Sequence, residues 1–125
     1  MKGNVFCGTS CMKAECVCSA GGIYAEGDIV ACSDARGKND VGVISNALNK
    51  VNRLCGVTYT TKQASRNMGF IAQDVAPIVP EVVYSGVSGE QYGLQYQNMT
   101  ALLVEAIKEQ SKKIDSLEKK LKDQS

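Results

Sequence analysis

Ser33 and Lys38 lie five residues apart, with Asp34 and Gly37 between them. A serine hydroxyl becomes a nucleophile when a neighbouring base takes its proton, and a lysine can be that base only while its amine is neutral. Burial favours the neutral amine, and Ser-Lys pairs on other folds use this effect. Five residues of extended strand would span about 16 Å, so the two side chains meet only if the chain turns between them. Asp34 and Gly37 are residues that turns favour.

The same residues also have an ordinary structural explanation. Lys38 can be a solvated surface side chain, and Ser33 or Asp34 can cap a helix. The chain contains no histidine, which excludes sites built on a Ser-His or Cys-His pair and the mixed Cys/His zinc sites.

The segment that precedes Ser33 is expected to be extended, so that the chain reaches Ser33 in an extended conformation. Residues 1–22 are rich in Gly, Cys and Ser and predict short extended pieces with turns. Residues 23–25 and 29–31 are apolar and flank a plausible turn at residues 26–28, which predicts a strand pair.

A helix is predicted over residues 41–54, with one face buried and Asn39 or Asp40 as its cap. Cys55 and Gly56 are expected to end it. Apolar side chains recur there at helical spacing at Val41, Ile44, Leu48 and Val51.

The middle of the chain predicts short strands. Alternation or apolar runs mark strands at residues 57–61, 68–71, 82–84 and 92–96. Residues 72–79 predict a short helix or turn that Pro77 and Pro80 limit. Residues 62–67 predict a loop, and residues 85–91 predict a hairpin loop containing Gly86 and Gly89. The expected fold class is α+β, with a short antiparallel sheet and one packed helix.

A long helix is predicted over residues 97–123, with heptad character and mostly charged or polar residues away from the seam. One amphipathic helix packed on its own domain is the alternative to a short coiled coil. Lys113 and Glu118 flank the seam at g and e positions. The seam positions are Thr100, Leu103, Ile107, Gln110, Ile114, Leu117 and Leu121.

The Ser33–Lys38 stretch, the motif Gly-Phe-Ile-Ala-Gln-Asp-Val at residues 69–75 and the C-terminal heptads follow one another in this order. Together they resemble the intramolecular chaperone domain at the C-terminus of phage tail spikes and tail fibres, the S74-type self-cleaving peptidases. A related domain occurs in the myelin regulatory factor. The resemblance covers residues 28–122.

The resemblance implies roles for individual residues. Ser33 would be the nucleophile, Lys38 its base, and the cut would fall between Cys32 and Ser33. Asp34 and Arg36 would organise the turn. Gln73 would be a supporting donor, together with Asn67, which stands where many family members carry a histidine; family members also commonly carry an apolar residue in place of Gly37.

The resemblance further implies a homotrimer held by a coiled coil over residues 97–123, with a seam of Leu103, Ile107, Ile114, Leu117 and Leu121. Residues 1–32 would be the end of a fibre shaft, and residues 33–125 the chaperone domain. Its expected function is to drive trimer assembly and then leave by autoproteolysis, as a single-turnover serine endopeptidase. The expected partners are the shaft or other tail proteins, in the host cytoplasm during assembly and in the virion tail if the domain is not released.

Two alternatives stay open. One is an uncleaved structural or receptor-binding tip of a tail fibre. The other is a small cysteine-rich metal-binding protein fused to a coiled coil. The gaps between the cysteines do not repeat a zinc knuckle, so we expect small buried thiols and no metal or other cofactor. The cysteines are Cys7, Cys11, Cys16, Cys18, Cys32 and Cys55.

Composition sets the remaining expectations. The 125 residues carry a net charge of +1, so bulk electrostatics gives no reason to expect a nucleic-acid partner. No apolar run approaches the roughly 20 residues that span a membrane, and no apolar segment follows Met1 and Lys2, so neither a membrane span nor a signal peptide is expected.

Overall fold

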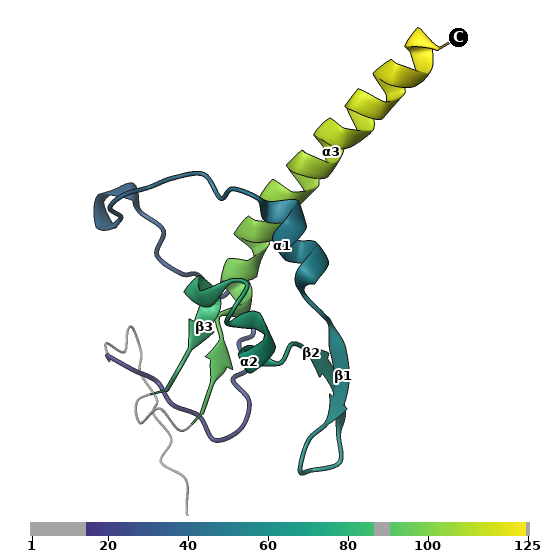
Figure 1. The fold of residues 1–125 in the computed structure, drawn as a ribbon. Helices are drawn as coiled ribbons and strands as arrows, with labels where there is room; N and C mark the ends of the chain where they lie inside the picture. Colours follow the sequence, from purple (N-terminus) through teal and green to yellow (C-terminus); the bar gives the residue numbers. More distant parts are fainter. Residues whose placement is uncertain (1–14, 87–90, 125) are drawn as a thin grey trace, which may run out of the picture. The chain divides into compact units, whose positions relative to one another are not determined.

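The computed structural model describes residues 15–86 and 91–124 (Figure 1). The chain divides into two compact units, Met1–Asn39 and Asp40–Ser125. No helix among the described residues combines the length and the apolar character that crossing a membrane requires.

The N-terminal unit contains one regular element among its described residues, the 3-10 turn η1 (Ala35–Gly37). The strand pair predicted at residues 23–25 and 29–31 is wrong: the structure has a bend at residues 26 and 27 but no strand on either side. Ile23 and Val30 are 70% and 87% exposed, so no apolar face is covered there. A hairpin without such packing is marginal in water, which accounts for the difference. The pieces predicted at residues 1–14 lie outside the described residues.

In the C-terminal unit, α1 (Ala47–Arg53) begins six residues later than predicted. Asn46 has a left-handed backbone, with φ of 56°, which a continuous helix from residue 41 does not allow. Gly42 adds a residue that disfavours a helix interior. Val41 is consequently 80% exposed instead of packed, whereas the predicted end of the helix is close to the observed one.

The core of this unit lies between α1, α2 (Ala72–Val75) and the first half of α3 (Met99–Asp123). Val75 is the largest side chain among the described residues to be almost fully buried, at 1% exposure. Both α1 and α3 contribute a buried alanine to this core, Ala47 and Ala106. The buried cluster is Ala47, Val75, Val79, Val82, Met99, Leu102 and Ala106.

The strands form two separate two-stranded antiparallel sheets, where one sheet was predicted. In the first, β1 (Val57–Thr60) pairs with β2 (Arg66–Gly69), so the second strand starts two residues earlier than expected. In the second, β3 (Val83–Tyr84) pairs with β4 (Gly93–Leu94). The 3-10 turn η2 (Pro80–Val82) precedes β3, and η3 (Tyr96–Asn98) shortens the predicted fourth strand and leads into α3. Residues 87–90 of the predicted hairpin loop lie outside the described residues.

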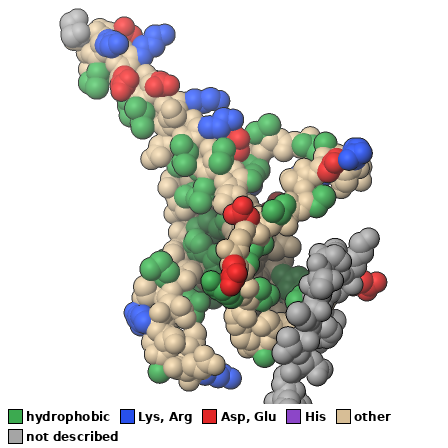
Figure 2. All heavy atoms as spheres, turned by 180° about the vertical axis from the view of Figure 1, so that it is seen from behind, with side chains coloured by type: hydrophobic (Ala, Val, Ile, Leu, Met, Phe, Trp, Pro, Cys, Tyr) green, Lys and Arg blue, Asp and Glu red, His purple; other side chains and the backbone are tan. Residues whose placement is uncertain are grey.

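Helix α3 has two apolar faces. One face, with Met99, Leu102 and Ala106, is buried in the core. The second face is formed by residues that follow the buried ones by one position in sequence, such as Leu103 and Ile107. The side chains of this face are 45–67% exposed. The far half of α3 extends beyond the other elements of its unit (Figure 1), and apolar side chains continue along it between charged ones (Figure 2). The exposed face consists of Leu103, Ile107, Ile114, Leu117 and Leu121.

Candidate functional site

The turn between Ser33 and Lys38 forms from local hydrogen bonds. Asp34 caps η1, and its side chain accepts a hydrogen bond from the backbone N–H of Arg36 at 2.8 Å. The backbone N–H groups of Gly37 and Lys38 donate to the carbonyls of Asp34 and Ala35, each at 3.1 Å. An aspartate at the start of such a turn is favoured because its short side chain reaches the free N–H two residues on.

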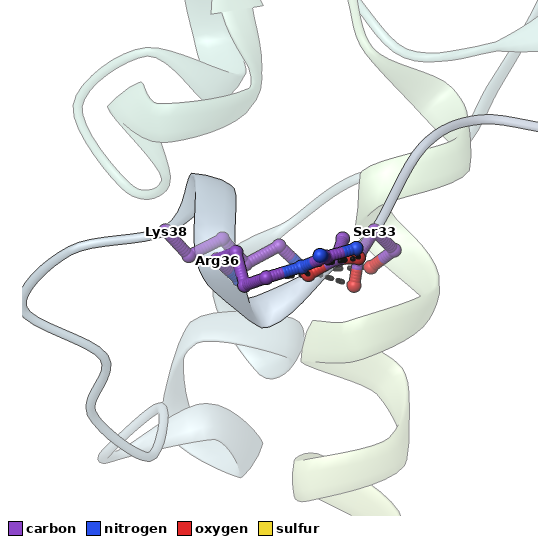
Figure 3. Close-up of polar contacts among 4 residues, drawn as sticks. Ser33, Arg36 and Lys38 are labelled. Carbon is purple, nitrogen blue, oxygen red and sulfur yellow. Dashed lines mark hydrogen bonds and ion pairs between the residues drawn. The ribbon is translucent and has the colours of Figure 1, made fainter.

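This turn brings the two candidate catalytic side chains together. Nζ of Lys38 donates to Oγ of Ser33 at 2.6 Å and also lies 3.4 Å from the carbonyl oxygen of Ser33 (Figure 3). The Nζ–Oγ distance is within the range over which a general base takes a proton. The turn therefore holds the Ser33 hydroxyl and the Lys38 amine in direct hydrogen-bond contact.

Asp34 and Arg36 are joined by an ion pair, with 2.7 Å between Nη2 and Oδ2 (Figure 3). Nε of Arg36 also donates to both carboxylate oxygens, at 3.1 and 3.2 Å. Hydrogen bonds from the side chain and then from the backbone of Arg36 lower the pKa of Asp34, and the same pair raises the pKa of Arg36. Asp34 is thus held in the charged form that caps the turn.

The whole stretch from Cys32 to Lys38 is exposed to solvent. A lysine acts as a base more readily when burial disfavours its charged form, and the described residues provide no such burial around Lys38. The turn therefore supplies the contact between nucleophile and base, and desolvation has to come from elsewhere.

The other two predicted site residues belong to the C-terminal unit. Asn67 lies in β2 opposite Tyr59 and is exposed. Gln73, in α2, lines an open cavity of about 320 Å³ together with the rings of Tyr59, Phe70 and Tyr96. The structure brings Ser33 together with Lys38, and Asp34 together with Arg36; support of Ser33 by Asn67 or Gln73 stays a prediction.

Tyr96 was not predicted as a site residue from the sequence, although it contacts the start of the Gly-Phe-Ile-Ala-Gln-Asp-Val motif at residues 69–75. The hydroxyl of Tyr96 accepts a hydrogen bond from the backbone N–H of Phe70 at 3.1 Å. A Cβ on Gly69 would come within 2.5 Å of that hydroxyl oxygen, so a larger residue at this position would have to displace the Tyr96 ring. The glycine signals a close approach in the sequence, but its partner, 27 residues away, carries no such signal.

The expectation of buried thiols is wrong for the described cysteines. Cys16, Cys18, Cys32 and Cys55 are free and exposed. The first three lie in the N-terminal unit, where none of the described residues is buried, and Cys55 follows the end of α1 in the C-terminal unit. Among residues 15–86 and 91–124, no three His, Cys, Asp or Glu side chains are grouped as a metal site would need. Cys7 and Cys11 lie outside the described residues, so the absence of zinc stays a prediction.

Comparison with known proteins confirms the resemblance. The family model Peptidase_S74, described as chaperone of endosialidase, matches residues 33–84. The long tail fiber protein Gp37 of Salmonella phage S16 is 30% identical over 114 residues, which is 82% of this chain and 15% of that protein. The Gp37 proteins of Escherichia phage AR1 and Enterobacteria phage K3 are each 34% identical, over 66% and 71% of this chain. The chain thus spans only 8–15% of the length of these relatives.

Proposed function

We propose that this chain, whose residues 33–84 match the Peptidase_S74 family, is the intramolecular chaperone of a phage tail fibre. It drives assembly of a homotrimer and is then released by cutting the peptide bond before Ser33. The observation that carries the proposal is the 2.6 Å contact between Lys38 Nζ and Ser33 Oγ. The family match supports it, because the match begins at Ser33, the first residue after the proposed cut.

In the proposed reaction, Lys38 in its neutral form takes the proton of the Ser33 hydroxyl, and Oγ attacks the carbonyl carbon of Cys32. Collapse of the tetrahedral intermediate breaks the bond between that carbon and the Ser33 nitrogen, which receives the proton from Lys38. The product is an ester between the Cys32 acyl group and Ser33 Oγ. Water hydrolyses this ester, leaving a carboxylate on Cys32 and a free N-terminus on Ser33.

The cut is proposed to follow trimer formation. The turn is exposed in the single chain, and lysine needs burial to become a base near neutral pH. Association of three chains is what would exclude water from the turn. A site that matures only in the trimer prevents a chain from losing its chaperone before assembly.

The exposed apolar face of α3 is the proposed trimer seam. Leu103, Ile107 and Ile114 remain 45–63% exposed although the helix packs on its own unit through another face. Apolar residues at alternating three- and four-residue spacing associate by burying that stripe in a coiled coil. Lys113 and Glu118 flank the stripe and can pair between chains.

Holding three chains in register removes part of the entropy cost that slows folding of intertwined fibres. After cleavage the registering element is gone, and the fibre is kinetically trapped in its assembled form. The Gp37 relatives are named as long tail fiber proteins. The proposed partners are therefore the fibre shaft or other tail proteins, in the host cytoplasm during assembly and in the virion tail if the domain stays attached.

The second candidate is a permanent tip of the fibre that shares the fold and is never cut. The exposure of Ser33 and Lys38 favours it, because a lysine acts as a base more readily when it is buried. In that case the Ser33–Lys38 contact is a structural hydrogen bond.

A time course after refolding tests both candidates, with sedimentation velocity and intact mass measured on the same samples. The proposal expects trimers first and a fragment of residues 33–125 later, with a lag that lengthens on dilution. A monomer throughout would overturn the trimer, and cleavage without any lag would overturn its coupling to assembly. A trimer that keeps its full mass would establish the permanent tip.

A further inference from the structure

One polar residue interrupts the exposed apolar face of α3. Gln110 occupies the seam position between Ile107 and Ile114, and every other seam position from Leu103 to Leu121 is apolar. Gln110 is exposed, and its side-chain amide makes no hydrogen bond within the part of the chain that the structure describes. No contact among residues 15–86 and 91–124 therefore accounts for a glutamine at this position.

Gln110 also stands where α3 leaves its own unit. Ala106 is the last buried residue of the helix, and the carboxylate of Glu109 accepts a hydrogen bond from the N–H of Leu48 in α1. From Gln110 onward no residue of α3 is buried. Its environment in an assembly is therefore set by the partner helices.

We propose that Gln110 fixes the axial register in which α3 pairs with the same helix of two further copies of this chain. The inference rests on the proposed trimer. Apolar seam layers are interchangeable, because a slip of one heptad still puts Ile114 against Ile107 and keeps each layer apolar. Such layers hold the helices together without specifying their alignment.

A slip changes the environment of Gln110. In register, three glutamine amides meet in one layer, where each can donate to and accept from its neighbours. When one chain slips by one heptad, its Gln110 faces Leu117 of both partners, or Leu103 of both if it slips the other way, so its amide is buried without a partner. An unsatisfied buried amide is costly, and a polar group at one core position is a known way of specifying register at the expense of stability.

The direction of the helices is constrained by Gln110 and by its charged neighbours. In an antiparallel pairing an a position packs against a d position, so Gln110, at d, would face Ile107 or Ile114 and its amide would lack a partner. Lys113 and Glu118 face each other in a parallel arrangement without slip. Gln110 therefore acts on register and on direction, and this pair supports both.

The register matters for the proposed chaperone. A slip of one heptad displaces one chain along the axis by about 10 Å. In an extended strand this corresponds to about three residues, enough to misalign an intertwined shaft upstream. A single polar layer close to the globular unit is well placed to prevent that error.

The test compares Gln110→Leu with Gln110→Asn and with Ser116→Leu, which adds the same apolar group on the outer face of α3. Each chain carries the photo-reactive amino acid benzoylphenylalanine in place of Leu121. Cross-linked peptides are then mapped by mass spectrometry, and melting and sedimentation are recorded in parallel.

We expect the unsubstituted Gln110 chain, Gln110→Asn and Ser116→Leu to cross-link at one position on the partner helix, around residues 117–121. Gln110→Leu should remain trimeric, melt at a higher temperature and add cross-links displaced by seven residues. A Gln110→Leu trimer with the single original cross-link would overturn the role of Gln110 while leaving the trimer intact. If the unsubstituted chain sediments as a monomer, both the trimer and the role of Gln110 are overturned. Sedimentation alone shows this, so it does not depend on the cross-links.

Discussion

The carboxylate of Glu109, in α3, accepts a hydrogen bond at 2.5 Å from the backbone N–H of Leu48, in the first turn of α1. Asn46, the residue that precedes α1, makes no side-chain cap. A charge supplied by a different helix therefore satisfies one of the free N–H groups and interacts favourably with the positive end of the α1 dipole. This contact fixes how α1 packs against the helix that carries the proposed seam.

Replacing Glu109 by alanine should destabilise the C-terminal unit by about 1–2 kcal/mol, because the helix loses a charged cap. The measurement is urea unfolding at a fixed chain concentration. Glu105→Ala is the matched control: it removes an ion pair with Lys108 on the surface of the same helix and should cost less than about 1 kcal/mol. If the two variants lose the same free energy of unfolding, Glu109 does not act as a cap of α1.

Hydrogen bonds from Arg36 lower the pKa of the Asp34 carboxyl from its usual 3.8. Removing the Arg36 side chain should therefore raise that pKa. Because the folded pKa is lowered, the charged cap is fully present above the unfolded pKa and is lost as pH falls through the folded value. Carboxyl NMR of Asp34 should therefore show a midpoint below 3.8, and Arg36→Ala should move it up toward that value. An unchanged midpoint in Arg36→Ala would contradict the ion pair.

Gly69→Ala should displace the Tyr96 ring and break its hydrogen bond to the backbone of Phe70, since the new methyl group would lie 2.5 Å from the hydroxyl oxygen. We expect a loss of about 1–3 kcal/mol from overpacking. Tyr96→Phe alone should cost about 1 kcal/mol for the missing hydrogen bond. In the double variant the penalty of the methyl group should shrink, because the clashing oxygen is gone; strictly additive losses in thermal unfolding would disprove the clash.

Ile114→Asp should dissociate the proposed trimer, because it buries an unpaired charge in the seam at a cost of several kcal/mol. Ser116→Asp places the same charge on the outer face and should leave the trimer intact. Sedimentation equilibrium at micromolar concentration distinguishes them. A trimer that survives Ile114→Asp would place the interface elsewhere.

The elements of the C-terminal unit could be predicted because they depend on local patterns. The long helix, the strand at residues 57–60 and the short helix at Ala72 follow from periodicity and from the positions of Pro77 and Pro80. The start of α1 could not be predicted, since its cap comes from Glu109, 61 residues away in sequence. The N-terminal strand pair failed because alternation predicts a strand only where some surface covers it.

The candidate site shows the same division. Asp34, Arg36 and Gly37 predict a turn, and that turn is what brings Ser33 and Lys38 into contact. The burial of Lys38 is a property of whatever packs on the turn, and no pattern within residues 33–38 specifies it. The contact between Gly69 and Tyr96 could not be predicted either. A glycine indicates that some group approaches the backbone closely, but not which residue provides it.

Self-cleavage before Ser33 is the central claim, and its products are defined. Ser33→Ala should abolish the cut by removing the nucleophile, and Lys38→Ala should slow it nearly as much. Lys38→Arg should not restore it, because a guanidinium stays protonated and cannot act as a base. The cut should need no added protease, and metal chelators should have no effect on it, because the reaction is intramolecular and uses no metal.

The most direct measurement is the intact mass and N-terminal sequence of the purified chain during prolonged folded incubation, beside Ser33→Ala. The account predicts that the unsubstituted chain is converted to a fragment of residues 33–125 that begins at Ser33, while Ser33→Ala keeps its full mass. A chain that stays intact, or a Ser33→Ala variant that is cut at the same bond at the same rate, would contradict it.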